Sequence, residues 1–169
     1  MNKQKTKDCL VLWSRLVETE KDFYSARAQL LSKCGRQFVV ELVHARLQSV
    51  EDRATALGIV PLLTVEEQQQ LFDALLSLAS FSHGLTTTVR EIILSLPRTW
   101  VIANIEEASE QLLKHDDYET YWGLLSLYIE LDRDITLRLA QKAVSHADED
   151  IKEAGEHFIK RLSSKSSLE

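Results

Sequence analysis

The chain has 169 residues, of which 44% are hydrophobic and 27% are charged, and its formal net charge is −6. This size and composition are typical of one globular domain and exclude an intrinsically disordered chain. Only 5 glycines and 2 prolines are present, which favours helices joined by short turns over a β-rich fold with many turn residues. The two cysteines, Cys9 and Cys34, are too few for a disulfide framework, so we expect reduced thiols.

The negative charge lies entirely in the second half of the chain. Residues 1–84 contain ten Lys or Arg and ten Asp or Glu, whereas residues 85–169 contain ten and sixteen. Nucleic-acid binding requires a basic surface, so this balance argues against a nucleic-acid partner and favours a protein with a basic surface. No segment approaches the roughly 18 apolar residues of a membrane span, and no signal-peptide pattern is present. We therefore expect a cytoplasmic protein without membrane contact.

Apolar residues recur at intervals of three and four, the spacing of helices with one buried face. A first helix is expected through Leu10 and Val17. Thr19-Glu20-Lys21-Asp22 resembles a capping box, which predicts a second helix from Thr19 to a stop at Cys34-Gly35. The further helices are expected at 37–48, from 50 to a kink or end at Pro61, and at 64–81, 88–96, 100–114, 117–131, 135–145 and 151–162.

Several side chains are predicted to hold particular positions in these helices. Thr64-Val65-Glu66-Glu67 is the clearest capping box, and Asp116 or Asp117 is expected to cap the helix that follows it. Trp13 and Trp122 lie on apolar stripes and are predicted to be core residues. Trp100 lies at a helix junction, where an aromatic residue is often half-buried; core packing is favoured for it, and a position in an interface is the alternative. The inward face of the third helix is expected to carry Phe38, Leu42, Ala45 and Leu47.

About ten short helices with short linkers place sequential neighbours in antiparallel contact. A compact bundle and a stack of helix pairs both satisfy this constraint. Ten helices of this length are too many for a four-helix bundle, so the sequence favours stacking. We expect a single all-α domain at residues 1–163 and a polar tail at 164–169, whose last two residues, Leu168-Glu169, resemble a cloning remnant.

Internal similarity supports the stack. Residues 120–131 align with 151–162 at an offset of 31, with small residues at Gly123 and Ala154, where closely packed helices need them. The stretch 143–162 resembles the turn and helix of the HEAT-repeat superfamily, and 52–57, with Pro61 shortly after, resembles a second copy. The resemblance extends over about residues 36–163. It implies a right-handed α-solenoid that serves as a protein-binding scaffold, without catalytic residues or cofactors.

An acidic strip at residues 106–119 is the strongest candidate for a binding surface. Its carboxylates are accompanied only by Lys114, and a basic partner would be attracted to them. The alternative is a solvated surface whose acids favour helix N-termini. Arg98 and Trp100 lie close by and belong to types enriched at interfaces. The predicted partner-binding residues are Glu106, Glu107, Glu110, Asp116, Asp117, Glu119, Arg98 and Trp100.

Other function classes have less support. An enzyme on a helical-repeat frame would be similar to bilin lyases or to alkylated-base DNA glycosylases, but a glycosylase needs a basic groove. A metal–carboxylate protein would rest on Glu41 and His44, whose Glu-x-x-His spacing occurs only once. No Gly-x-Ser-x-Gly motif and no glycine-rich phosphate loop occurs, so the sequence predicts no catalytic residue and no metal or cofactor.

Overall fold

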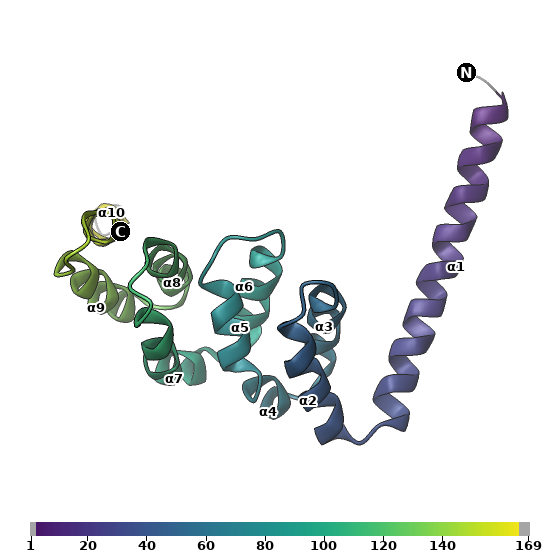
Figure 1. Ribbon diagram of the computed structural model, residues 1–169, viewed down its shortest axis with the longest axis horizontal. Coiled ribbons are helices and arrows are strands. Elements are labelled where there is room, and N and C mark those ends of the chain that lie inside the picture. Colours follow the sequence, from purple (N-terminus) through teal and green to yellow (C-terminus); the bar gives the residue numbers. More distant parts are fainter. Residues whose placement is uncertain (1–2, 166–169) are drawn as a thin grey trace. The chain divides into compact units, whose positions relative to one another are not determined.

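The computed structural model describes residues 3–165, and these form ten α-helices and one short 3-10 helix with no β-strand among them (Figure 1). Side chains are described for residues 7–164. The predicted all-α class is confirmed, whereas the predicted tail at 164–169 lies mostly outside the described residues. The helices are α1 (Lys3–Lys33), α2 (Arg36–Leu47), α3 (Arg53–Ile59), η1 (Val60–Leu62), α4 (Val65–Gln69), α5 (Phe72–Ala79), α6 (Thr86–Ser95), α7 (Arg98–Leu113), α8 (Tyr118–Leu131), α9 (Arg133–Val144) and α10 (Glu149–Lys165).

The helices group into two compact units, Met1–Leu42 and Val43–Glu169. In the first unit, α1 is one continuous helix of 31 residues, so the prediction of a new helix at Thr19 is wrong. The Thr19 hydroxyl donates to the carbonyl of Arg15 at 2.9 Å, as in the middle of a helix. No glycine or proline precedes Gly35, so nothing in the sequence interrupts the helix before the predicted stop.

Two predictions of burial near the N-terminus are also wrong. Trp13 is 65% exposed, and no described side chain of α1 is buried. In α2, Phe38 is 58% exposed, and the buried positions are Val39, Val40, Val43 and Leu47. Only Leu47 of the predicted inward face is buried there, because the apolar face lies about one residue away from the predicted one.

The second unit is built from helices that contact both their sequence neighbours and the helices after those. Sequential contacts join α5 to α6, α7 to α8, α8 to α9 and α9 to α10, while α5 also contacts α7, α6 contacts α8, and α8 contacts α10. Figure 1 shows α6, α8 and α10 in one row, with α7 and α9 in another. The core of this unit includes the fully buried side chains of Leu71, Leu75, Leu76, Ile93, Ile105, Tyr121, Leu124, Leu125, Tyr128 and Phe158.

Local sequence signals set several helix ends. Thr64 forms the predicted capping box with Glu67, and Pro61 lies in η1 directly after α3. The capping box opens only the five residues of α4, so the predicted continuous helix 64–81 is wrong. The N–H of Leu71 bonds the carbonyl of Gln68, three residues back, and this tighter turn separates α4 from α5. No residue of α4 is buried, whereas most of α5 is, so the two segments need different orientations.

Close helix packing in the second unit depends on a small residue at Gly123, as predicted, and in α10 on Gly155, next to the predicted Ala154. Gly123 of α8 lies against the backbone of Ser80, and Ala154 of α10 is fully buried. The guanidinium of Arg90 in α6 donates to the carbonyl of Gly123 at 3.1 Å and to that of Ala79 at 3.4 Å. These contacts fasten α5, α6 and α8 together.

Candidate functional site

Helix α7, the turn after it and the start of α8 carry the predicted binding residues. Arg98 and Trp100 lie in the first turn of α7, and Glu106, Glu107 and Glu110 lie farther along the same helix. Asp116 and Asp117 belong to the turn between α7 and α8, and Glu119 to the first turn of α8. All eight therefore lie on two adjacent segments, but their side chains form different contacts, which divide the strip into structural and open positions.

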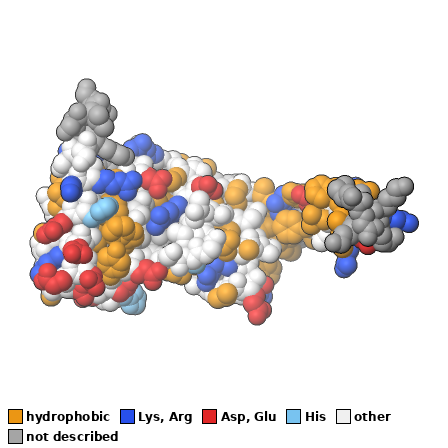
Figure 2. All heavy atoms as spheres, turned by 90° about the horizontal axis from the view of Figure 1, so that it is seen from above, with side chains coloured by type: hydrophobic (Ala, Val, Ile, Leu, Met, Phe, Trp, Pro, Cys, Tyr) orange, Lys and Arg blue, Asp and Glu red, His pale blue; other side chains and the backbone are white. Residues whose placement is uncertain are grey.

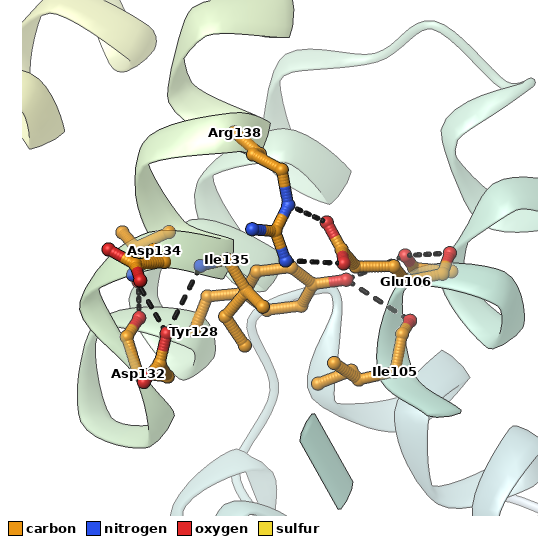
Figure 3. Close-up of polar contacts among 9 residues, drawn as sticks. Ile105, Glu106, Tyr128, Asp132, Asp134, Ile135 and Arg138 are labelled. Atoms are coloured by element: carbon orange, nitrogen blue, oxygen red, sulfur yellow. Dashed lines mark hydrogen bonds and ion pairs between the residues drawn. The ribbon is translucent and has the colours of Figure 1, made fainter. Parts of the chain in front are cut away.

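Glu106 is bound by Arg138 of α9. Its two carboxylate oxygens accept hydrogen bonds from Nε and Nη2 of Arg138 at 2.8 and 2.7 Å (Figure 3). These hydrogen bonds, opposed by some desolvation and aided by the charge of Arg138, hold the pKa of Glu106 below its ordinary value. This bidentate ion pair links α7 to α9. Because both oxygens of Glu106 already accept hydrogen bonds, this carboxylate is less able to bind a partner protein.

A buried hydroxyl pair lies on α7 and α8 next to this link. The hydroxyl of Tyr128 lies 2.7 Å from that of Ser109 and donates to the carbonyl of Ile105 at 3.1 Å (Figure 3). Burial raises the pKa of Tyr128 to about 12, although the Ser109 hydrogen bond acts in the opposite direction. Tyr128 is thus a neutral, structural hydroxyl at ordinary pH.

Asp117 and Glu119 satisfy backbone groups. Asp117 caps α8 by accepting from the N–H of Thr120 at 2.8 Å, which confirms the predicted cap. Partial burial acts to raise the pKa of Asp117, but the hydrogen bonds from Thr120 outweigh it and lower the pKa overall. Glu119 accepts from the N–H of Ser82 at 2.9 Å and so ties the start of α8 to the turn after α5.

Asp116 pairs with an imidazole from the turn between α9 and α10. Its Oδ1 lies 3.3 Å from Nε2 of His146, and the N–H of Asp148 donates to Nδ1 of the same ring at 3.0 Å. Asp116 also has a positive φ of 51°. Because both nitrogens of His146 are occupied, this residue joins two turns.

The two interface candidates at the start of α7 differ. Arg98 donates to the carbonyl of Leu131 at the end of α8, so it acts within the fold. Trp100 is half-buried, and its ring lies edge-on to that of Phe72, with centroids 5.1 Å apart. Trp122, by contrast, is 36% exposed beside His157 and Phe158, so its predicted core position is wrong.

A cavity of about 510 Å³ opens beside α7, between it and α4 and α5. Phe72 and Trp100 supply its aromatic wall, and Asp73, Glu107 and Glu110 supply three exposed carboxylates. No Lys or Arg lines it; the other lining residues are Gln69, Asn104, Ala108 and Gln111. Within the described part of the chain, these three carboxylates form no hydrogen bond or ion pair. We call this site the α7 cavity.

Two further cavities on the other side of α7 have mixed charge. One, of about 660 Å³, is lined by Glu110, Asp116 and His146 together with Lys114 and Lys142. The other, of about 210 Å³, contains the Glu106–Arg138 pair and Lys142. Glu110 lines all three cavities, but only the α7 cavity lacks a basic side chain.

Phe72 and Asp73 were not among the site residues predicted from the sequence. They follow the polar segment 66–70 and lie more than 25 positions before Trp100, so no spacing in the sequence connects them to α7. Only the contact between α5 and α7 brings them beside Trp100 and Glu107.

The alternative site at Glu41 and His44 gains no further ligand. Glu41 accepts from Gln37 Nε2 at 3.2 Å, and among the described residues no group of three or more His, Cys, Asp or Glu side chains is placed to hold a metal ion.

No helix in the described ranges is both long and apolar enough to cross a membrane. Comparisons of the chain with protein-family models, curated proteins and solved structures gave no match.

Proposed function

We propose that this chain is a non-enzymatic, protein-binding scaffold that takes up a basic segment of another protein in the α7 cavity. The observation that carries the proposal is the composition of that cavity: two aromatic rings beside three carboxylates, with no Lys or Arg. Such a site is complementary to an Arg or Lys side chain, whose stem packs on the half-buried Trp100 ring while its charge meets the carboxylates.

The contacts of the acidic strip divide the predicted binding residues into those that are free to bind a partner and those that are engaged within the fold. Glu107, Glu110, Trp100 and Asp73 are proposed to bind the partner, while the buried Phe72 supports the Trp100 ring. Glu106, Asp116, Asp117, Glu119 and Arg98 are proposed to support the surface, because each of their side chains is occupied within the fold. We also propose a cytoplasmic location, in which the partner is a protein and not a membrane.

The scaffold is proposed to be a HEAT-like, right-handed solenoid of helix pairs. Contacts of α5 with α7, of α6 with α8 and of α8 with α10 support it, because stacked pairs pack each helix on its equivalent in the next pair. Under this proposal, α5 with α6, α7 with α8 and α9 with α10 are successive repeats. A crystal structure of the chain tests the handedness and the number of repeats.

Binding is tested with the purified chain as bait in lysate and in titrations with an Arg- and Lys-rich peptide. Changing Glu107→Gln together with Glu110→Gln removes two cavity charges and leaves the Glu106–Arg138 link intact. The matched control, Glu153→Gln with Glu156→Gln, removes two exposed acids from α10.

We expect the wild type and the α10 control to retain the same protein and to bind the peptide with equal affinity. The α7 variant should lose the protein and weaken peptide binding about tenfold, since loss of two charge contacts removes on the order of 1–2 kcal/mol. Equal retention by all three chains would show that the α7 cavity is not the binding site.

A further inference from the structure

Helix α1 has an apolar face that is exposed to solvent. Leu10, Trp13 and Leu16 are each about 60% exposed, and Phe23 and Tyr24 are also exposed. Figure 2 shows the hydrophobic side chains of α1 at the molecular surface. Exposed apolar surface of this extent on one helix marks an interaction site.

The apolar residues follow the seven-residue spacing of helices that pair. Leu16, Phe23 and Leu30 are seven residues apart, and Cys9 precedes them at the same interval. Trp13 lies beside them on the same face. The opposite face carries the polar residues Ser14, Glu18, Lys21, Asp22, Ser25, Gln29 and Ser32, and near its N-terminal end the exposed Val11.

Two opposite charges interrupt the middle of this apolar face. Glu20 and Arg27 occupy the positions between Trp13 and Cys34 in the seven-residue pattern. They are seven residues apart, about 10 Å along the helix axis, which is too far for an ion pair within one helix. Instead, Glu20 accepts from the Tyr24 hydroxyl at 3.3 Å, and the Arg27 guanidinium lies 4.8 Å from the centre of the Tyr24 ring.

The order of these charges specifies the direction of a partner helix. A second α1 in antiparallel orientation, related by a two-fold axis between Phe23 and Tyr24, places each Glu20 opposite the Arg27 of the other copy. The same axis places Leu16 opposite Leu31 and Val17 opposite Leu30. A parallel pair would place Glu20 opposite Glu20 and Arg27 opposite Arg27, and like charges in contact are unfavourable.

We propose that α1 is a self-association helix and that its exposed apolar face binds α1 of a second copy in antiparallel orientation, with Glu20 and Arg27 selecting that orientation. Two identical copies then form a closed, symmetric pair in which each apolar face covers the other. The proposal concerns the first unit only and is independent of the α7 cavity.

The test is sedimentation equilibrium of the full chain at concentrations up to about 100 µM, a range that detects micromolar association. We expect a dimer of the wild type. Glu20→Arg and Arg27→Glu should each weaken dimerisation at least about tenfold, since each change creates two like-charge contacts across the pair. The chain with both changes should dimerise like the wild type, because the two pairs are restored with their signs exchanged.

The control is Glu18→Arg, which makes the same change of charge on the polar face of α1 and should leave dimerisation unchanged. Circular dichroism confirms that every variant keeps its helix content. A monomeric wild type would overturn the proposal and indicate that the apolar face has another occupant. Single variants that dimerise as tightly as the wild type would overturn the antiparallel pairing.

Discussion

Gly123 of α8 faces the carbonyl of Ser80, at the end of α5, with no space for a side chain between them. A Cβ atom on Gly123 would lie 2.1 Å from the Ser80 oxygen and 2.4 Å from its carbonyl carbon. Because the obstacle is backbone, the clash cannot be relieved by a change of rotamer. The contact between α5 and α8 in the second unit therefore depends on this glycine.

Replacing this glycine should strongly destabilise the second unit. We expect Gly123→Ala to lower the free energy of unfolding by about 3 kcal/mol, because α8 must move away from α5 and open the core between them. Urea unfolding monitored by circular dichroism measures the change. Gly58→Ala is the matched control, since nothing lies within 4 Å of a Cβ there. In the helical α3 it should stabilise the protein by up to about 1 kcal/mol. Equal stability of the Gly123 variant and the wild type would contradict the close approach.

Glu106 and Glu107 are neighbours with different roles, so neutralising each should have different effects. Glu106→Gln should lower stability at pH 7 by less than about 1 kcal/mol, because the ion pair with Arg138 is partly solvated. Glu107→Gln should have no effect on stability.

The acid dependence of stability should differ in the same way. Because the folded-state pKa of Glu106 is lowered, its contribution is present above the unfolded pKa of about 4.5 and is lost as pH falls through the folded value. The difference in unfolding free energy between the wild type and Glu106→Gln should therefore decrease from pH 6 to pH 3. A constant difference over that range would contradict a native-state role for the ionised carboxylate.

Tyr128 should make the protein sensitive to alkali. Its folded-state pKa of about 12 lies above the unfolded value of about 10, so ionisation of the unfolded state favours unfolding as pH rises between these values. Between pH 9 and 12, the wild type should lose about 2 kcal/mol more stability than Tyr128→Phe, which cannot ionise. Tyr118→Phe, at an exposed ring, is the control and should follow the wild type. Parallel pH profiles of the wild type and Tyr128→Phe would disprove this effect.

Asp116 combines a left-handed backbone with a side-chain contact, and two substitutions separate the two features. Both Asp116→Gly and Asp116→Ala remove the contact with His146, but only glycine adopts a φ of 51° without steric cost. The alanine variant should therefore be about 1 kcal/mol less stable than the glycine variant in thermal or urea unfolding. An alanine variant as stable as the glycine variant would show that the turn changes conformation freely.

The sequence was sufficient for the all-α class and for several helix ends, because these depend on local chemistry. The caps at Thr64 and Asp117, the stop at Gly35 and the break at Pro61 involve groups within a few residues of each other. The small residue at Gly123 was also recognised, since it matches Ala154 in the alignment of residues 120–131 with 151–162. The error at Thr19 arose because a capping sequence in a helix without a breaker has no structural effect.

Pairing across helices was decided only by the tertiary structure. Glu106, Glu107 and Glu110 look equivalent in the sequence, yet Arg138, 32 residues after Glu106, binds only the first of them. Likewise, Trp100 becomes part of an acidic cavity only because the contact between α5 and α7 brings Phe72 and Asp73 to it. The sequence alone determined where acids and aromatic residues occur along each helix. Which of them remain open to a partner depends on side chains distant in the chain, whose positions follow from helix packing and not from local spacing.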